Sequence, residues 1–95
     1  MAQPLAVPVW QCRAREPNMR IPIGATWVDY VPEVNDRIEA NARQGVFVFE
    51  IFETNMTVYQ FDLIKLTQKN GKTGFERPIR RSFASMVSRP VQSRL

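Results

Sequence analysis

The chain has 95 residues, 44% of them hydrophobic and 23% charged, which is enough for one modest core, so we expect a single folded domain. It has one cysteine and no histidine, which excludes a disulfide framework and removes the usual ligands of a zinc site. No stretch approaches the roughly 20 apolar residues of a membrane span, and no secretory signal is present, so we expect an intracellular protein that does not enter a membrane.

The formal net charge of +4 is unevenly distributed. From Lys65 onward, eight basic residues stand against Glu76 alone, whereas the first 64 residues carry a small acidic excess. The C-terminal third should therefore attract an anionic ligand.

The N-terminal part predicts two short strands separated by a loop. Residues 7–12 are rich in valine and include Trp10, and Pro8 would restrict that strand to a sheet edge. Residues 13–24 contain prolines, a glycine and mixed charges, which are typical of a loop. A second short strand is expected at residues 26–28.

The clearest helix is expected from Pro32 to about Gln44. Proline suits the first helical position, Gly45 supplies a C-terminal stop, and apolar residues recur on one face at Val31, Val34, Ile38 and Ala42. Acid-first pairs four residues apart favour ion pairs on the exposed side, namely Glu33 with Arg37 and Glu39 with Arg43.

Four strands are expected after the helix. Residues 46–52 are β-branched or aromatic almost throughout, which predicts a central strand buried on both faces, and residues 56–62 alternate as a half-buried strand should. Residues 63–68 predict a further strand, followed by turns at Asn70-Gly71 and Thr73-Gly74. The last strand is expected at residues 75–81, on an edge because of Pro78. The domain should therefore span residues 7–82, with flexible termini at 1–6 and 83–95.

The order and spacing of these residues resemble those of the WWE domain family, which is named for two tryptophans and a glutamate. The resemblance runs from about Trp10 to Arg81. The residues that carry it are Trp10, Trp27 with Tyr30 in a W-x-x-Y arrangement, Ile38-Glu39, Tyr59-Gln60-Phe61-Asp62-Leu63, Gln68, Asn70-Gly71-Lys72-Thr73-Gly74 and Arg77-Pro78-Ile79-Arg80-Arg81.

The resemblance implies an α+β fold, a half-barrel of about six strands curled around one helix. It also implies recognition of poly(ADP-ribose), or of an ADP-ribosylated protein, through the iso-ADP-ribose unit of the polymer. Domains of this family accompany ubiquitin-ligase or ADP-ribosyltransferase domains, neither of which lies within these 95 residues.

Such a ligand needs an aromatic or apolar wall, amide donors and acceptors, and cations. By the resemblance, Tyr59 would stack or hydrogen-bond, Gln68 would contact the adenine edge or a ribose, and Arg77 would hold a phosphate through its planar fork. Lys72, Arg80 and Arg81 would add charge at the rim. The residues alone leave alternatives open: Tyr59 also fits a core aromatic, and arginines on an edge strand also serve solubility.

The family positions Trp10, Trp27, Tyr30 and Glu39 are assigned mainly to structure, with Arg43 or a backbone donor as the expected partner of Glu39. Two positions depart from the family's ligand-binding members, which often carry aromatic residues where this chain has Cys12 and Val28. The aromatic wall is therefore expected to be thin.

Two other functions remain open. Cys12 and Val28 favour a protein-interaction or scaffolding domain that has lost its ligand, and the basic C-terminal third favours nonspecific nucleic-acid binding with a steep salt dependence. We expect no enzyme, cofactor or metal, because the chain has no histidine for general base chemistry and no glycine-rich phosphate loop followed by a helix. We also expect a monomer.

Overall fold

The structure is a computed structural model that describes residues 7–13, 27–53 and 56–84. Most of the loop expected at 13–24, the terminus expected at 1–6 and residues 85–95 of the expected tail lie outside these residues. The elements in chain order are β1 (Val7–Arg13), β2 (Trp27–Asp29), α1 (Pro32–Arg43), β3 (Val48–Phe52), β4 (Val58–Asp62), β5 (Thr67–Asn70) and β6 (Glu76–Ala84).

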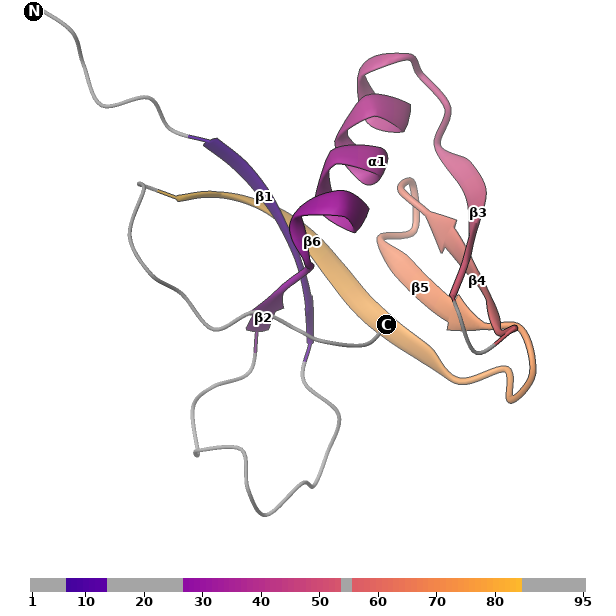
Figure 1. Cartoon of the computed structure of the whole chain (residues 1–95). Coiled ribbons are helices and arrows are strands. Elements are labelled where there is room, and N and C mark those ends of the chain that lie inside the picture. The colour runs from indigo at the N-terminus through magenta and orange to yellow at the C-terminus, as the bar shows by residue number, and fades with distance from the viewer. Residues whose placement is uncertain (1–6, 14–26, 54–55, 85–95) are drawn as a thin grey trace, which may run out of the picture.

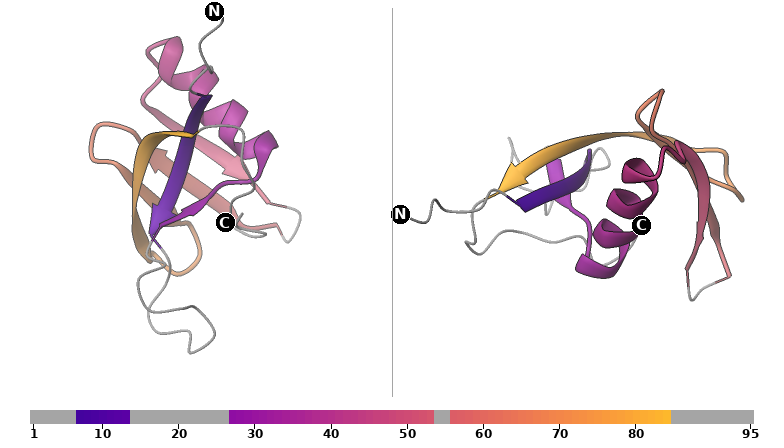
Figure 2. Two further views of the ribbon diagram at one scale, coloured as in Figure 1. Left: turned by 90° about the vertical axis from the view of Figure 1, so that its left-hand side faces the viewer. Right: turned by 90° about the horizontal axis from the view of Figure 1, so that it is seen from above.

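The six strands form one antiparallel sheet in the order β2-β1-β6-β5-β4-β3. The sheet is open, and it curls around α1, which lies on its concave side (Figures 1 and 2). We call the face toward α1 the inner face and the opposite face the outer face. The α+β half-barrel that the sequence predicts is confirmed.

Strand β6 joins the two halves of this sheet. Its first three residues pair with β5 and end at Pro78, and its pairing with β1 begins at Ile79 and runs to Ala84. Proline has no N–H to donate, so it is tolerated where one ladder stops and the other starts. The prediction that this strand lies at an edge is wrong, because β6 is central and only its pairing partner changes at Pro78.

The core fills the space between the inner face and α1. Phe61 is its centre: its ring stacks on Phe49, with 5.3 Å between centroids, and meets the edge of Tyr30 at 5.9 Å. Burying such an aromatic side chain contributes roughly 1.5 to 3 kcal/mol. The buried apolar residues are Trp10, Cys12, Tyr30, Ile38, Ile51, Tyr59, Phe61 and Ile79.

A helix side chain completes the hydrogen bonding of β1. Asn35 of α1 accepts from the backbone N–H of Trp10, at 2.6 Å, and donates to the carbonyl of Pro8, at 3.1 Å. The Asn35 amide thus supplies one acceptor and one donor to β1, as the backbone of a neighbouring strand would. β2 pairs with β1 only from Gln11 to Arg13, so the Asn35 amide continues the ladder where β2 is absent.

The carboxylate of Glu39 ties the helix to the sheet. It accepts from Trp10 Nε1 on β1 at 2.9 Å and from Arg81 on β6 at 2.9 and 2.7 Å, and it accepts from Arg43 of its own helix at 2.8 Å. The expected pair with Arg43 is present, but Glu39 is buried, whereas the helical pattern predicted a pair on the exposed side. The hydrogen bonds from Arg81 are the main reason that the pKa of Glu39 falls from 4.5 to about 2.

Strand β3 differs from its prediction. The apolar run predicted a central strand buried on both faces, but β3 is the last strand of the sheet and has only β4 beside it. Of its five residues only Ile51 is buried, and Val48 and Phe52 lie on the outer face at 64% and 70% exposure. Strong strand propensity was mistaken for burial, and the two are independent for a strand at an edge.

The prediction of a strand at residues 63–68 is wrong for residues 63–66 and correct for Thr67 and Gln68. Residues 63–66 form a turn, and β5 begins at Thr67. The Asp62 side chain accepts from the N–H groups of Ile64 and Lys65, both at 2.9 Å, and Leu66 adopts a positive φ of 58°. An aspartate that bonds to the backbone two and three residues onward favours a turn over a continuing strand. The turns at Asn70-Gly71 and Thr73-Gly74, and the helix with its stop at Gly45, are confirmed.

Asn35→Ala should destabilise the domain by about 1 to 3 kcal/mol, because it leaves the Trp10 N–H and the Pro8 carbonyl without partners. Asn41→Ala is the matched control, since that amide donates to the carbonyl of Arg37 within its own helix. Urea denaturation of both variants measures the difference in the free energy of unfolding. Equal costs for the two substitutions would contradict the role of Asn35.

Glu39→Gln should lower the free energy of unfolding at neutral pH by about 1 to 2 kcal/mol. Because the folded-state pKa lies below the ordinary value, the carboxylate stabilises the fold above about pH 4.5, and this contribution is lost as the pH falls toward about 2. The difference between wild type and variant should therefore shrink across that range in chemical denaturation. Asp36→Asn, on an exposed position of the same helix, is the control for the removal of one carboxylate.

Candidate functional site

Three of the residues predicted to bind ligand share one part of the inner face. Gln68 on β5 and Arg77 on β6 are opposite each other, and Gln68 is also opposite Phe61 on β4. Tyr59 stands two residues before Phe61, so its side chain projects to the same face. Residues from three adjacent strands are therefore brought together at one end of the half-barrel. We call Tyr30, Tyr59, Gln68 and Arg77 the inner-face site. Tyr30 is included because its phenol contacts Gln68.

The phenol of Tyr30 donates a hydrogen bond to Gln68 Oε1. Tyr30 follows β2, from the far end of the sheet, so this bond joins segments 38 residues apart. Burial raises the pKa of the Tyr30 phenol well above its usual value, and the neighbouring Cys12 raises it further, against a smaller lowering by Arg77. The phenol therefore stays protonated at physiological pH, in the form that donates to Gln68.

This contact fixes the orientation of the Gln68 amide. Its oxygen is directed at Tyr30, so its Nε2 with two N–H donors is the other end of the group. The side chain is only 2% exposed, yet no acceptor for Nε2 lies within hydrogen-bond distance in the described part of the chain. A buried amide with unused donors is uncommon in folded proteins and calls for an acceptor from elsewhere.

Arg77 supplies the positive charge beside this amide. Its side chain is half-buried, and its guanidinium lies 6.0 Å from the centroid of the Phe75 ring. Neither of the two ion pairs formed among the described residues involves Arg77. Its planar set of donors is therefore not used in an ion pair among the described residues.

A residue that stacks on a ligand at the surface must be exposed, but Tyr59 is buried and belongs to the core cluster. The sequence left open whether it is a core aromatic or a ligand contact, and the structure places it in the core. Its contribution to ligand binding stays a prediction.

The three residues expected at the rim are dispersed. Lys72 lies in the exposed turn between β5 and β6, and its backbone N–H bonds to the Asn70 side chain. Arg80 lies on the outer face, where it donates to Gln11 Oε1 at 2.8 Å and stacks over the Trp27 ring at 4.3 Å. Arg81 returns to the inner face, but its guanidinium is bound to Glu39.

Sequence reasoning assigned Tyr30 mainly to structure and missed its contact with Gln68. The W-x-x-Y spacing identifies the residue, but nothing in the sequence connects it to Gln68. The alternation of β5 was a usable signal, because it places the polar Gln68 on the buried face and thereby requires a partner. The positions of Trp10 and Glu39, which bond to each other, agree with a structural assignment.

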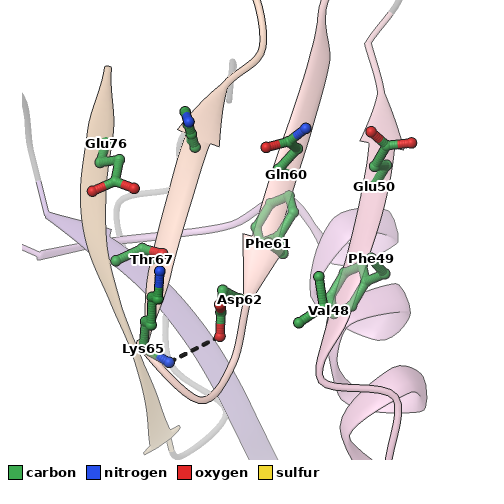
Figure 3. Close-up of a pocket in the computed structure, with 10 residues that line it drawn as sticks. Val48, Phe49, Glu50, Gln60, Phe61, Asp62, Lys65, Thr67 and Glu76 are labelled. Carbon is green, nitrogen blue, oxygen red and sulfur yellow. Dashed lines mark hydrogen bonds between the residues drawn. The ribbon is translucent and has the colours of Figure 1, made fainter. Parts of the chain in front are cut away.

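A cavity of about 520 Å³ opens elsewhere, on the outer face of β3 to β6 (Figure 3). A row of polar residues crosses it from strand to strand, from Glu50 through Gln60 and Lys69 to Glu76. None of the residues predicted to bind ligand lines this cavity. It is therefore distinct from the inner-face site.

Within residues 7–13, 27–53 and 56–84, no group of three metal-ligating side chains could hold a metal ion, and no helix is long and apolar enough to cross a membrane. No curated protein matches the chain. The sequence model of the WWE domain family matches residues 8–81, which cover all but the ends of the described fold. The match, the half-barrel and the bond between Trp10 and Glu39 lead to one conclusion: the chain belongs to the WWE domain family, whose members are binding modules.

Proposed function

We propose that this domain binds poly(ADP-ribose), or proteins that carry it, through the iso-ADP-ribose unit at the inner-face site. The observation that carries the proposal is the buried amide of Gln68, whose Nε2 donors have no acceptor among the described residues. Adenine ring nitrogens and ribose oxygens are acceptors of the kind this amide requires. We propose no catalytic role for the chain.

Arg77 adds the second requirement of such a ligand. Its guanidinium, on the strand next to Gln68, could hold a phosphate with two parallel hydrogen bonds. One ligand that contacts both residues must present an acceptor and an anionic group a few ångströms apart. A nucleotide unit with a pyrophosphate has this arrangement.

The aromatic wall is the weaker part of the site. Cys12 and Val28 face each other across β1 and β2, at positions that are often aromatic in ligand-binding relatives, and Cys12 is fully buried against Tyr30. The loss of one stacking surface costs on the order of 1 to 3 kcal/mol by analogy with base stacking, which is about tenfold to hundredfold in affinity. We therefore propose moderate affinity, with specificity supplied by Gln68 and Arg77.

As partners we propose ubiquitin-ligase or ADP-ribosyltransferase domains, in line with the family. The nucleic-acid hypothesis is less favoured, because two of the basic residues it requires are already engaged: Arg81 with Glu39, and Arg80 with Gln11 and Trp27.

Calorimetric titration with iso-ADP-ribose tests the proposed function, with ADP-ribose and poly(A) as comparison ligands. Wild type should bind iso-ADP-ribose in the micromolar range, and Gln68→Ala and Arg77→Ala should each weaken binding by about tenfold or more. Arg37→Ala, an exposed arginine on α1, is the control for a general loss of positive charge. Equal affinity for poly(A) would indicate a nucleic-acid surface, and no heat at millimolar ligand from folded protein would refute the proposal.

Tyr30→Phe tests the orientation of the amide. Without the phenol, Gln68 is no longer held with its oxygen toward residue 30, so its donors are presented to a ligand only part of the time. We expect a loss in affinity of about threefold to tenfold, with the aromatic ring and the fold retained. Calorimetry measures the affinity, and thermal unfolding of the same sample shows that the variant is folded. Unchanged affinity would mean that the bond between Tyr30 and Gln68 has no part in recognition.

A further inference from the structure

Strand β3 has an edge to which no described element pairs. It is the last strand of the sheet, with β4 on one side only, and it stands at the outer limit of the half-barrel (Figures 1 and 2). An unpaired strand edge presents backbone donors and acceptors that can template another strand.

The hydrogen bonding to β4 determines which residues face that edge. The N–H of Leu63 donates to the carbonyl of Phe47 at 2.7 Å, and the N–H of Glu53 donates to the carbonyl of Thr57 at 2.9 Å. Hydrogen-bonded pairs recur at every second residue of an antiparallel ladder. Phe49 and Ile51 therefore bond to β4, and the N–H and C=O groups of Val48, Glu50 and Phe52 point away from the sheet.

The same three residues carry their side chains on the outer face. Val48 and Phe52 are exposed apolar groups that flank the Glu50 carboxylate at two residues on either side. In Figure 3, Glu50 ends a row that begins at Glu76 and includes Gln60. The strand register places Lys69 between Gln60 and Glu76. No cation in the described residues forms an ion pair with Glu50.

Soluble proteins usually protect such an edge. The common devices are a proline or lysine on the strand, a bulge, or a covering element. The β3 sequence Val48–Phe52 has neither proline nor lysine, and it pairs with β4 residue for residue without a bulge. Its backbone, its apolar side chains and its unpaired charge are together arranged for a further strand.

We propose that the free edge of β3 is a docking surface for an extended segment of a partner protein. That segment adds a strand beside β3, places a lysine or arginine opposite Glu50, and places apolar side chains two residues away on each side against Val48 and Phe52. Backbone pairing supplies affinity, and the alternate side chains supply specificity. This surface lies on a different strand from Gln68 and Arg77 and does not depend on the function proposed for them.

A second copy of this chain fits the same edge less well. If two β3 strands pair antiparallel about Glu50, the two carboxylates are directly opposite each other, which is unfavourable. The registers shifted by two residues place Glu50 opposite Val48 or Phe52 and leave the carboxylate without a cation. A basic residue in the added strand resolves both conflicts, so the charge of Glu50 selects a partner that is not β3 itself.

The test uses the 95-residue chain, labelled with ¹⁵N, and the capped peptide GTVTKTVTG, with GTVTETVTG as its charge-reversed control. Hydrogen exchange should be fast at the amides of Val48, Glu50 and Phe52 in the free protein and should slow on addition of the lysine peptide. The glutamate peptide should bind at least about threefold more weakly, and Glu50→Lys should reverse the preference.

Val48→Pro removes one outward N–H but no bond to β4, so the domain should stay folded and lose peptide binding. Phe52→Asp should weaken binding, and Ile64→Asp, at 75% exposure in the β4–β5 turn, is its matched control. The proposal would be overturned if peptide affinity is unchanged by Val48→Pro and by the charge at residue 50. It would also be overturned if no peptide binds at millimolar concentration. A dimer in sedimentation velocity that Val48→Pro abolishes would overturn it as well, because the second copy would then be the occupant.

Discussion

The buried carboxylate of Glu39 is the contact on which the arrangement of this domain depends. One side chain accepts hydrogen bonds from β1, from β6 and from its own helix, so it fixes the distance and angle between α1 and the middle of the sheet. Asn35, one turn earlier in the helix, adds a second polar connection to β1. Apolar packing alone would leave the helix freer to slide, because hydrophobic contacts are not directional.

The placement of the helix also positions the inner-face site. Tyr30 stands between β2 and α1, and its backbone N–H bonds to the carbonyl of Trp10, the residue whose indole reaches Glu39. The tryptophan and glutamate of the family name therefore act indirectly, by holding Tyr30 over Gln68. These two residues thereby help to determine which atoms of Gln68 face away from Tyr30.

Much of the fold could be predicted from the sequence, because the helix, its glycine stop and the later turns are encoded by short-range patterns. Two of the errors arose where long-range pairing decides: the burial of β3 depends on how many neighbouring strands it has, and the position of β6 depends on a change of partner at Pro78. The third error is local, because the turn after β4 depends on hydrogen bonds from the N–H groups two and three residues onward to the Asp62 side chain. At the site, residue types indicated Gln68 and Arg77. The sequence does not show that Arg80 and Arg77 lie on opposite faces of the sheet, or that Arg81 is bound to Glu39, because both depend on the strand register.

The change of partner along β6 has a mechanical consequence. The two half-sheets share a single strand, and their ladders meet at Pro78 and Ile79, where the Ile79 N–H still donates to the carbonyl of Leu66 at 3.0 Å. Tyr30 follows β2 of one half-sheet and Gln68 lies on β5 of the other, and their side chains span the join. A molecule that contacts both halves would cross the same join, so binding at the inner face would add a second connection between the two half-sheets.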